Sequence, residues 1–307
     1  MWNVLLLIVG FAGLIKGADW FVEGASKLAR RFGIPQLVIG LTIVAMGTSL
    51  PEAAVSISGA IKGTAGIAVG NVVGSNIFNV LVILGVTALI ACLPIQKSTL
   101  KIEIPYMLIV TVALLIMGVT GMEIGRVEGV LLWGMFLLYL GYLWWLSRRS
   151  NEASEESKEV WSVLKCVGFL LLGGVFILVG SNLTVDAAQN LAQMLGFSER
   201  FIGLTIVACG TSLPELVTSL VAAKKKHADI AIGNIVGSNI FNILFVIGTA
   251  SLITPIPFET AFIYDTIIAG AAGALLWLGV FRKRELRFPV GIVMLVCYMG
   301  YLVYLLQ

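Results

Sequence analysis

The chain has 307 residues, of which 59% are hydrophobic and only 12% charged, and its mean hydropathy is +1.01. Soluble domains carry roughly 25% charged residues, so this composition excludes a soluble protein and predicts an all-α integral membrane protein in contact with the lipid bilayer. The formal net charge of +3 comes from short basic clusters between apolar runs, which argues against nucleic acid as a partner.

Apolar runs of about 20 residues, the length at which a helix crosses a bilayer, recur along the whole chain. We predict ten transmembrane helices: 2–28, 36–60, 67–92, 102–120, 128–146, 161–188, 200–223, 230–253, 260–281 and 288–306. The first run lacks the basic start of a signal peptide and is interpreted as a span. The polar stretch 148–159 is predicted to be a cytoplasmic linker between a first repeat, 1–147, and a second, 160–307.

A seventeen-residue stretch occurs twice. GLTIVAMGTSLPEAAVS begins at Gly40 and GLTIVACGTSLPELVTS at Gly203, so thirteen of the seventeen positions are identical at an offset of 163 residues. A second pair of motifs, AVGNVVGSNIFNVLVILG from Ala68 and AIGNIVGSNIFNILFVIG from Ala231, has the same offset. Chance does not produce two such matches, so the two halves are predicted to be copies of one unit.

Lysine and arginine residues are distributed unequally between alternate loops. One side holds sixteen of them, including the run 224–226, and the other holds three: Lys62, Arg126 and Arg200. Because cytoplasmic loops are rich in basic residues, we place the first side in the cytoplasm and both termini outside the cell membrane. An odd number of spans per repeat reverses the second copy. This predicts two inverted five-helix repeats with a site at the midplane between them.

Each copy of the first motif places a carboxylate, Glu52 or Glu215, inside an apolar run, where a charge is costly. The preceding proline, Pro51 or Pro214, has no N–H and interrupts helical hydrogen bonding. Both spans are therefore predicted to be broken helices whose free carbonyls face a polar cavity. A structural role would explain a single buried carboxylate, but it explains poorly a duplicated carboxylate beside a duplicated helix break.

The second pair of motifs adds neutral oxygen donors. Ser75 and Asn79 lie four residues apart and share a helix face, and Ser238 and Asn242 repeat the arrangement. Carboxylate, hydroxyl and carbonyl oxygens suit Ca2+ and Na+, whereas zinc or copper would need histidine or cysteine. The motifs contain no histidine and one cysteine, Cys209, which is interpreted as a small buried apolar residue. The single histidine of the chain, His227, is interpreted as a solvated loop residue.

Other polar residues are given structural roles. Asn76 and Asn239 point away from the Ser–Asn face and are predicted to hold helices together. Three further acidic residues lie near span ends, where snorkelling or a salt bridge with Lys27 accounts for them: Asp19, Glu23 and Asp186.

With both motifs duplicated, the chain resembles the cation/Ca2+ antiporter superfamily, specifically prokaryotic Na+/Ca2+ exchanger-like proteins, over its whole length. The resemblance implies alternating-access antiport in which Ca2+ leaves the cytoplasm as Na+ enters. By matching position, it implies Ca2+ ligation by Glu52 and Glu215 with the carbonyls of Thr48 and Thr211. For Na+ it implies further ligands, with the last two near the centre: Ala45, Ser49, Ser75, Ala208, Ser212, Ser238, Asn79 and Asn242. Several relatives have aspartate at one of these last two positions, and some of those also use K+, so two asparagines argue against K+ coupling.

Other functions were weighed against antiport of Na+ and Ca2+. In a Ca2+/H+ antiporter, Glu52 and Glu215 would be protonated in exchange for Ca2+, but the hydroxyl groups around them favour Na+. A Ca2+ channel would place carboxylates in a ring around an oligomeric pore, whereas an inverted repeat predicts a functional monomer. The spans contain no aspartate pair, HExxH motif or Ser–His pair for an intramembrane protease, so no enzymatic activity is predicted. No P-loop or other cofactor motif is present, so no cofactor is expected.

Overall fold

The structure, a computed structural model, describes residues 2–63, 65–149, 161–195 and 208–305. Its α-helices are α1 (Trp2–Phe32), α2 (Gln36–Ile39), α3 (Ala45–Thr48), α4 (Leu50–Ile61), α5 (Gly66–Phe78), α6 (Gly85–Ile90), α7 (Ile104–Gly121), α8 (Arg126–Arg149), α9 (Val163–Met194), α11 (Ala208–Thr211), α12 (Leu213–Lys224), α13 (Ala228–Phe241), α14 (Gly248–Ile253), α15 (Thr260–Phe281) and α16 (Phe288–Leu305). Short π-helical segments connect several of them: η1 (Gly40–Val44), η2 (Asn79–Leu84), η3 (Thr99–Glu103) and η5 (Asn242–Ile247).

The described part of the chain contains eight helices long and apolar enough to cross a membrane. A ninth span is formed if the bent pair Gln36–Thr48 and Leu50–Ile61, whose axes differ by 51°, is counted as one. The predicted span 200–223 begins outside the described residues. The part of it that the structure describes forms α11 and α12. The predicted linker 148–159 begins inside α8, and its other residues lie outside the described ranges. The count of ten spans in two repeats therefore stays a prediction.

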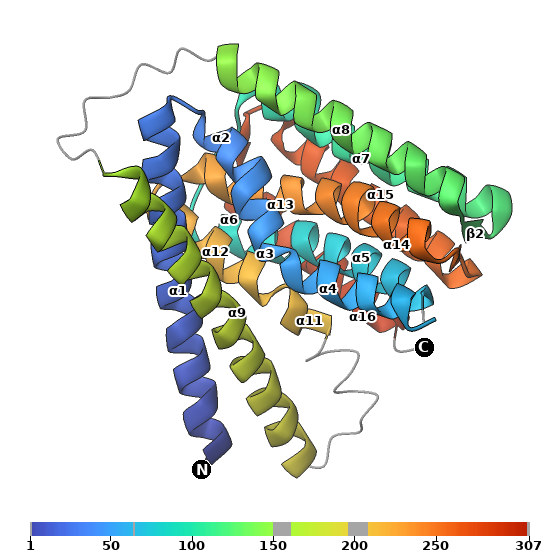
Figure 1. Ribbon diagram of the computed structural model, residues 1–307, viewed down its shortest axis with the longest axis horizontal. Helices are drawn as coiled ribbons and strands as arrows, with labels where there is room; N and C mark the ends of the chain where they lie inside the picture. Colours follow the sequence, from blue (N-terminus) through green and yellow to red (C-terminus); the bar gives the residue numbers. More distant parts are fainter. Residues whose placement is uncertain (1, 64, 150–160, 196–207, 306–307) are drawn as a thin grey trace.

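The long helices α1 and α9 lie side by side and antiparallel, and they extend beyond the other helices at the bottom of Figure 1. Glycines let their backbones touch. A Cβ atom on Gly17 would lie 2.8 Å from the carbonyl oxygen of Gly173, and one on Gly10 would lie 3.0 Å from that of Gly180. Small residues at such crossings allow the close backbone approach that stabilises helix pairs in lipid. The two helices therefore form one tightly packed unit.

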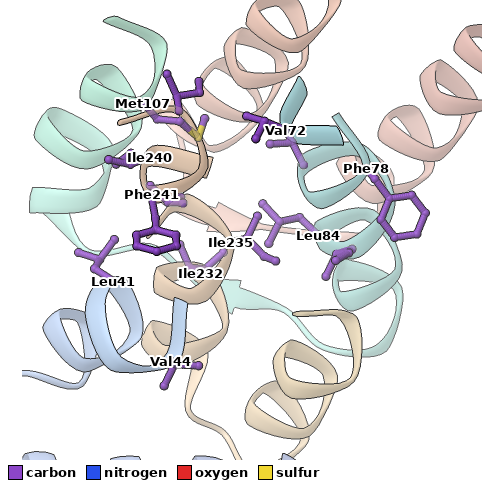
Figure 2. Packing of buried hydrophobic residues seen from close by; sticks show 14 of the residues in the cluster. Leu41, Val44, Val72, Phe78, Leu84, Met107, Ile232, Ile235, Ile240 and Phe241 are labelled. Atoms are coloured by element: carbon purple, nitrogen blue, oxygen red, sulfur yellow. The ribbon is translucent and has the colours of Figure 1, made fainter. Parts of the chain in front are cut away.

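The centre of the molecule is built from α5 and α13, which continue through η2 and η5 into α6 and α14. In the span Ala228–Ile253, 94% of the most apolar stretch is buried, against 72% for Gly66–Ile90 and 39% or less for the other spans. Figure 2 shows Ile232 and Ile235 of α13 packed among side chains from η1, α5 and η2, of which Leu41, Val72 and Leu84 are labelled. The duplicated second motif therefore forms the core on which the first motif packs.

Two pairs of short strands join loops from opposite halves of the chain. β1 (Leu93–Pro94) pairs antiparallel with β4 (Glu285–Leu286), and β2 (Glu123–Ile124) pairs antiparallel with β3 (Ile256–Pro257). One residue of each strand is fully or almost fully buried: Leu93, Ile124, Ile256 and Leu286. These side chains anchor the connections to the helices beneath them, because moving them into water would expose apolar surface.

Candidate functional site

Both duplicated proline motifs interrupt a helix. Ser49 separates α3 from α4 and has ψ near zero (φ −84°, ψ 8°), and Ser212 takes the same conformation before α12 (φ −90°, ψ 5°). Pro51 and Pro214 lie in the first turn that follows, where a missing N–H is tolerated. Each proline nevertheless deprives the carbonyl four residues earlier of a helical partner. The predicted interruption is confirmed in both copies.

The first turns of α4 and α12 carry the two carboxylates, which are completely buried. The hydroxyl of Ser49 donates to Oε1 of Glu215 over 2.8 Å, and the hydroxyl of Ser212 donates to Oε1 of Glu52 over 3.3 Å. Each carboxylate is thus bonded to the helix break of the other half. The positive end of the helix dipole also favours a negative charge in a first turn. Glu52 and Glu215 therefore belong to one site at the junction of the halves.

Each carboxylate and each of Asn79 and Asn242 has one oxygen atom that is buried without a hydrogen-bond partner among the described residues: Glu52 Oε2, Glu215 Oε2, Asn79 Oδ1 and Asn242 Oδ1. A buried polar atom without a partner is costly, and a buried carboxylate oxygen especially so. Such oxygens suit a cation that dehydrates and takes hard oxygen ligands.

The central asparagines are held by reciprocal bonds. Asn76 Nδ2 donates to the backbone carbonyl of Asn239, and Asn239 Nδ2 donates to that of Asn76, each over 3.1 Å. Asn79 Nδ2 donates to Asn239 Oδ1 over 3.0 Å, and Asn242 Nδ2 donates to Asn76 Oδ1 over 3.2 Å. The prediction that Asn76 and Asn239 join helices is confirmed. These bonds use the amide nitrogens of Asn79 and Asn242, so the amide oxygens of the two residues remain without a hydrogen-bond donor.

A third asparagine pair supports the carboxylates, and our sequence analysis missed it. Asn71 donates to the backbone carbonyl of Glu52 over 3.2 Å and to Oγ of Ser56 over 3.0 Å. Asn234 makes the equivalent two bonds in the other half, over 3.3 and 2.9 Å, and its oxygen accepts a bond of 3.0 Å from the hydroxyl of Thr48. Both asparagines occupy the same place in the duplicated second motif, which was the available signal.

The remaining predicted residues lie around this centre. Ser238 in α13 donates to the backbone carbonyl of Ala45 over 3.4 Å, which joins α13 to α3. Ser75 is buried at the equivalent position in α5. Thr211 is partly exposed at the end of α11, and the backbone of Ala208 begins that helix.

The two halves are not equally closed around the site. A cavity of about 420 Å³ lies between α4, α9 and α11 and is lined by Pro51 and Thr211, neighbours of the buried carboxylates. Leu50 and Val55 on its wall are 51% and 43% exposed. In the other half α12 packs against α1, and Thr218, the equivalent of Val55, is 0% exposed. The wall of the site is therefore exposed between α4 and α9 and packed between α12 and α1, while both carboxylates stay buried. A second cavity, of about 460 Å³, lies further towards the end of α12, between Lys16 and Asp19 of α1 and Lys225.

The acidic residues of α1 have a different partner from the predicted one. Lys225, just after α12, lies 2.6 Å from Oδ1 of Asp19 and 3.3 Å from Oε2 of Glu23. Lys27 instead lies over the ring of Trp161, 5.5 Å from its centroid. The predicted salt bridge with Lys27 is wrong, because spacing along one helix does not reveal a basic residue at the end of another.

The chain matches a known family over nearly its whole length. The family described as sodium/calcium exchanger protein matches residues 2–145 and 165–307. The chain belongs to the sodium/calcium exchanger family. It is 32% identical to the sodium/calcium exchanger MaX1 of Methanosarcina acetivorans, over 99% of this chain and 98% of that protein. It is 41% identical to the inner membrane protein YrbG of Escherichia coli, over 81% of this chain and 79% of that protein.

The fold of this exchanger is also similar to a solved one. A structure of the sodium-calcium exchanger NCX_Mj soaked with Na+ and Ca2+ superposes with a TM-score of 0.85, at 32% identity over 99% of this chain and 98% of that one. The family and these relatives confirm the predicted resemblance. They identify a multi-pass cation/Ca2+ antiporter whose substrates are Na+ and Ca2+.

Proposed function

We propose that this exchanger extrudes Ca2+ from the cytoplasm in exchange for Na+ by alternating access. The observation that carries the proposal is the pair of buried carboxylates, Glu52 and Glu215, each bonded to a serine of the other half and each with one oxygen left without a donor. Buried carboxylates need a compensating cation or donor. Two of them neutralise one Ca2+, which takes about six to eight hard oxygen ligands in flexible geometry.

We assign the Ca2+ ligands to Glu52, Glu215 and the carbonyls of Thr48 and Thr211, which directly precede the helix breaks. Na+ uses the same carboxylates together with nearby oxygens of the following residues: Ala45, Ser49, Ser75, Ala208, Ser212 and Ser238. Asn79 and Asn242 contribute amide dipoles at the centre rather than charge. Because both ions depend on one carboxylate pair, occupancy by Na+ weakens the binding of Ca2+, and the reverse also holds.

The same charges explain why the ions are exchanged rather than leaked. An empty site leaves two negative charges uncompensated in a medium of low dielectric constant, which costs several kcal/mol per ion. Closing water out of an empty site raises that cost further. A conformational change that occludes the site is therefore favourable only when Ca2+ or Na+ neutralises it, which couples the two fluxes.

Sidedness follows from the basic residues. Sixteen lysines and arginines in one set of loops against three in the other support a cytoplasmic location for the first set. Both termini then lie outside the cytoplasm, and the cavity between α4 and α9 opens to the outer side. Ca2+ would leave through this cavity and Na+ would enter by it. Since one chain supplies both carboxylates, the unit of transport is a monomer.

Ion fluxes in proteoliposomes test this function. Vesicles loaded with Na+ and diluted into Na+-free buffer should accumulate Ca2+ rapidly, whereas vesicles loaded with K+ should not. A pH gradient imposed without Na+ provides the comparison with proton coupling. Uptake driven by the proton gradient alone would assign the carboxylates to Ca2+/H+ exchange, and uptake independent of any gradient would indicate a channel.

A further inference from the structure

One ion-pair cluster fastens α1 to the end of α12. Besides its two ion pairs, with Asp19 and Glu23, Lys225 donates to the backbone carbonyl of Asp19 over 3.1 Å. Asp19 also pairs with Lys16 over 3.0 Å. The side chains of Lys225, Asp19 and Glu23 are 27%, 32% and 36% exposed, so water screens the charges only in part. The cluster stands beside the packed contact between α1 and α12 and lines the cavity of about 460 Å³ at the end of α12.

The second half repeats the components of this cluster at the offset of 163 residues. Lys62 corresponds to Lys225, and Asp186 corresponds to Glu23. The two lysines follow equivalent helices with nearly the same backbone conformation, φ −84° and ψ 1° for Lys62 against φ −78° and ψ 4° for Lys225. Asp19 has no charged counterpart, because Asn182 takes its place.

The second set of components is separated in this structure. Within the described ranges, neither Lys62 nor Asp186 takes part in any of the ion pairs. Both residues are exposed, and Asp186 lines the cavity between α4 and α9. Lys62 follows α4 and Asp186 lies in α9, so these two helices would have to approach each other for the ion pair to form. They are the helices between which the cavity lies.

We propose that Lys62 and Asp186 form an ion pair in the opposite-facing conformation, when the pair between Lys225 and α1 is broken. The two ion pairs are alternating latches, each holding one side of the transport site closed. This inference rests on the proposed alternating access. The contact between α1 and α9 links the latches, because helices packed glycine to glycine move together. As α9 approaches α4, α1 must then leave α12.

The latches differ in strength. The one formed here uses two carboxylates on α1, whereas the other has only Asp186 on α9. A lysine facing two carboxylates is held more tightly than one facing a single carboxylate, because the attractions add. The empty exchanger therefore favours the conformation described here, with its cavity open between α4 and α9. Lys225, Asp19, Glu23, Lys62 and Asp186 are positioning residues, since they act on the direction of access and not on the ion.

A cysteine that is reachable only in the opposite conformation measures this equilibrium. Val217 is equivalent to Ala54 of the cavity wall, but it is only 8% exposed because its side of the site is closed. In a Val217→Cys variant whose native cysteines are replaced, the rate of thiol labelling reports the population of the opposite conformation. Lys225→Gln should raise this rate, and Lys62→Gln should lower it, each by about two- to fivefold, as expected for partly exposed ion pairs. Lys224→Gln is the matched control and should leave the rate unchanged.

The two variants are expected to change the labelling rate in opposite directions. A general loosening of the fold would instead raise the labelling rate in both Lys225→Gln and Lys62→Gln. Changes of the same sign, or no effect of Lys62→Gln, would overturn the proposal. Swapping the two charges gives a second readout. Lys62→Glu should lower the labelling rate of the cysteine at position 217, and the double variant with Asp186→Lys should restore it, because the ion pair can then form with its charges reversed. Na+-driven Ca2+ uptake measured on the same preparations tests the transport function separately, since labelling is read without an ion gradient.

Discussion

Three glutamates are completely buried in the described part of the chain, but they differ in their surroundings. Glu52 and Glu215 receive hydroxyl groups from each other's half, whereas Glu103 at the end of η3 accepts a hydrogen bond from the hydroxyl of Tyr142 in α8. Burial alone therefore does not identify an ion ligand. The assignment depends on two carboxylates that meet at one junction.

Neutralising either member of the pair should abolish transport. Glu52→Gln and Glu215→Gln each remove one of two charges opposing a divalent ion, and losing one partner of a buried ion pair costs about 3–5 kcal/mol. Ca2+ affinity should therefore fall on the order of a hundredfold or more. Isothermal titration and vesicle uptake measure the loss. Glu103→Gln is the matched control and should keep its hydrogen bond with Tyr142 and its transport; wild-type uptake by Glu52→Gln would refute the site.

The histidine predicted to be solvated is instead half-buried between helices. Its Nδ1 lies 3.0 Å from Oε1 of Gln36, at the start of α2. Burial lowers the pKa of His227 below its ordinary 6.5, and the charges of Arg30 and Lys225 add to this effect. The neutral imidazole therefore stabilises the fold above pH 6.5, and that contribution is lost as the pH falls towards the lowered pKa of the folded state.

Thermal unfolding in detergent between pH 7.5 and 5 measures this contribution. Wild type should lose stability over the range, by about 1.4 kcal/mol for each unit of pKa depression. His227→Gln, which has nothing to titrate at this position, should lose less. Parallel pH profiles for the two proteins would contradict the assignment.

At the scale of elements, the exchanger contains one unusually close helix pair, α1 with α9. A Cβ atom on Gly17 would lie 2.7 Å from Cβ of Phe176 and 2.8 Å from the backbone nitrogen of Ile177, closer than ordinary contacts allow. On the same helix, a Cβ atom on Gly13 would have only one atom of a neighbouring helix within 4 Å, Cα of Gly180 at 3.9 Å. The two glycines thus differ in how much space surrounds them.

Gly17→Ala should force α1 away from α9 and destabilise the protein by about 1–3 kcal/mol, the usual cost of overpacking. Gly13→Ala should change stability little, because its new methyl group meets ordinary contact distances. Thermal denaturation of the two variants in one detergent gives the comparison. Equal melting temperatures would show that the backbone contact at Gly17 is looser than described.

At the scale of the whole molecule, the strand pairs mark two groups of loops. Arg126 follows β2, and Lys97 follows β1; both are exposed. In cells expressing a protein without native cysteines, Arg126→Cys should react with an impermeant thiol reagent added outside. Lys97→Cys should react only after permeabilisation. The reverse pattern would invert the proposed orientation and, with it, the direction assigned to Ca2+.

Much of the site was predictable because both of its sequence motifs occur twice in the chain. Equal offsets indicated that Glu52 and Glu215 are equivalent, and proline chemistry predicted the helix breaks beside them. The bonds from Ser49 to Glu215 and from Ser212 to Glu52 were not predictable, since composition does not say how one copy faces the other. The π-helical segments that begin at Asn79 and Asn242 were missed for a similar reason. A π-turn requires one extra residue per turn, which apolar periodicity over a single span does not resolve.

The strand pairs also limit how the exchanger can move. β1 with β4 and β2 with β3 join the two halves of the chain at two separate places. Two halves joined at two places cannot rotate apart about a single hinge. Such a rotation would break the backbone hydrogen bonds of a strand pair and expose its buried side chains. We therefore expect the fastened helices to act as a rigid frame and α1 with α9 to shift across it. In the proposed cycle, the energetic cost of changing conformation would then fall on the contact between these two helices and the frame, and the proposed ion ligands of the frame would keep their positions.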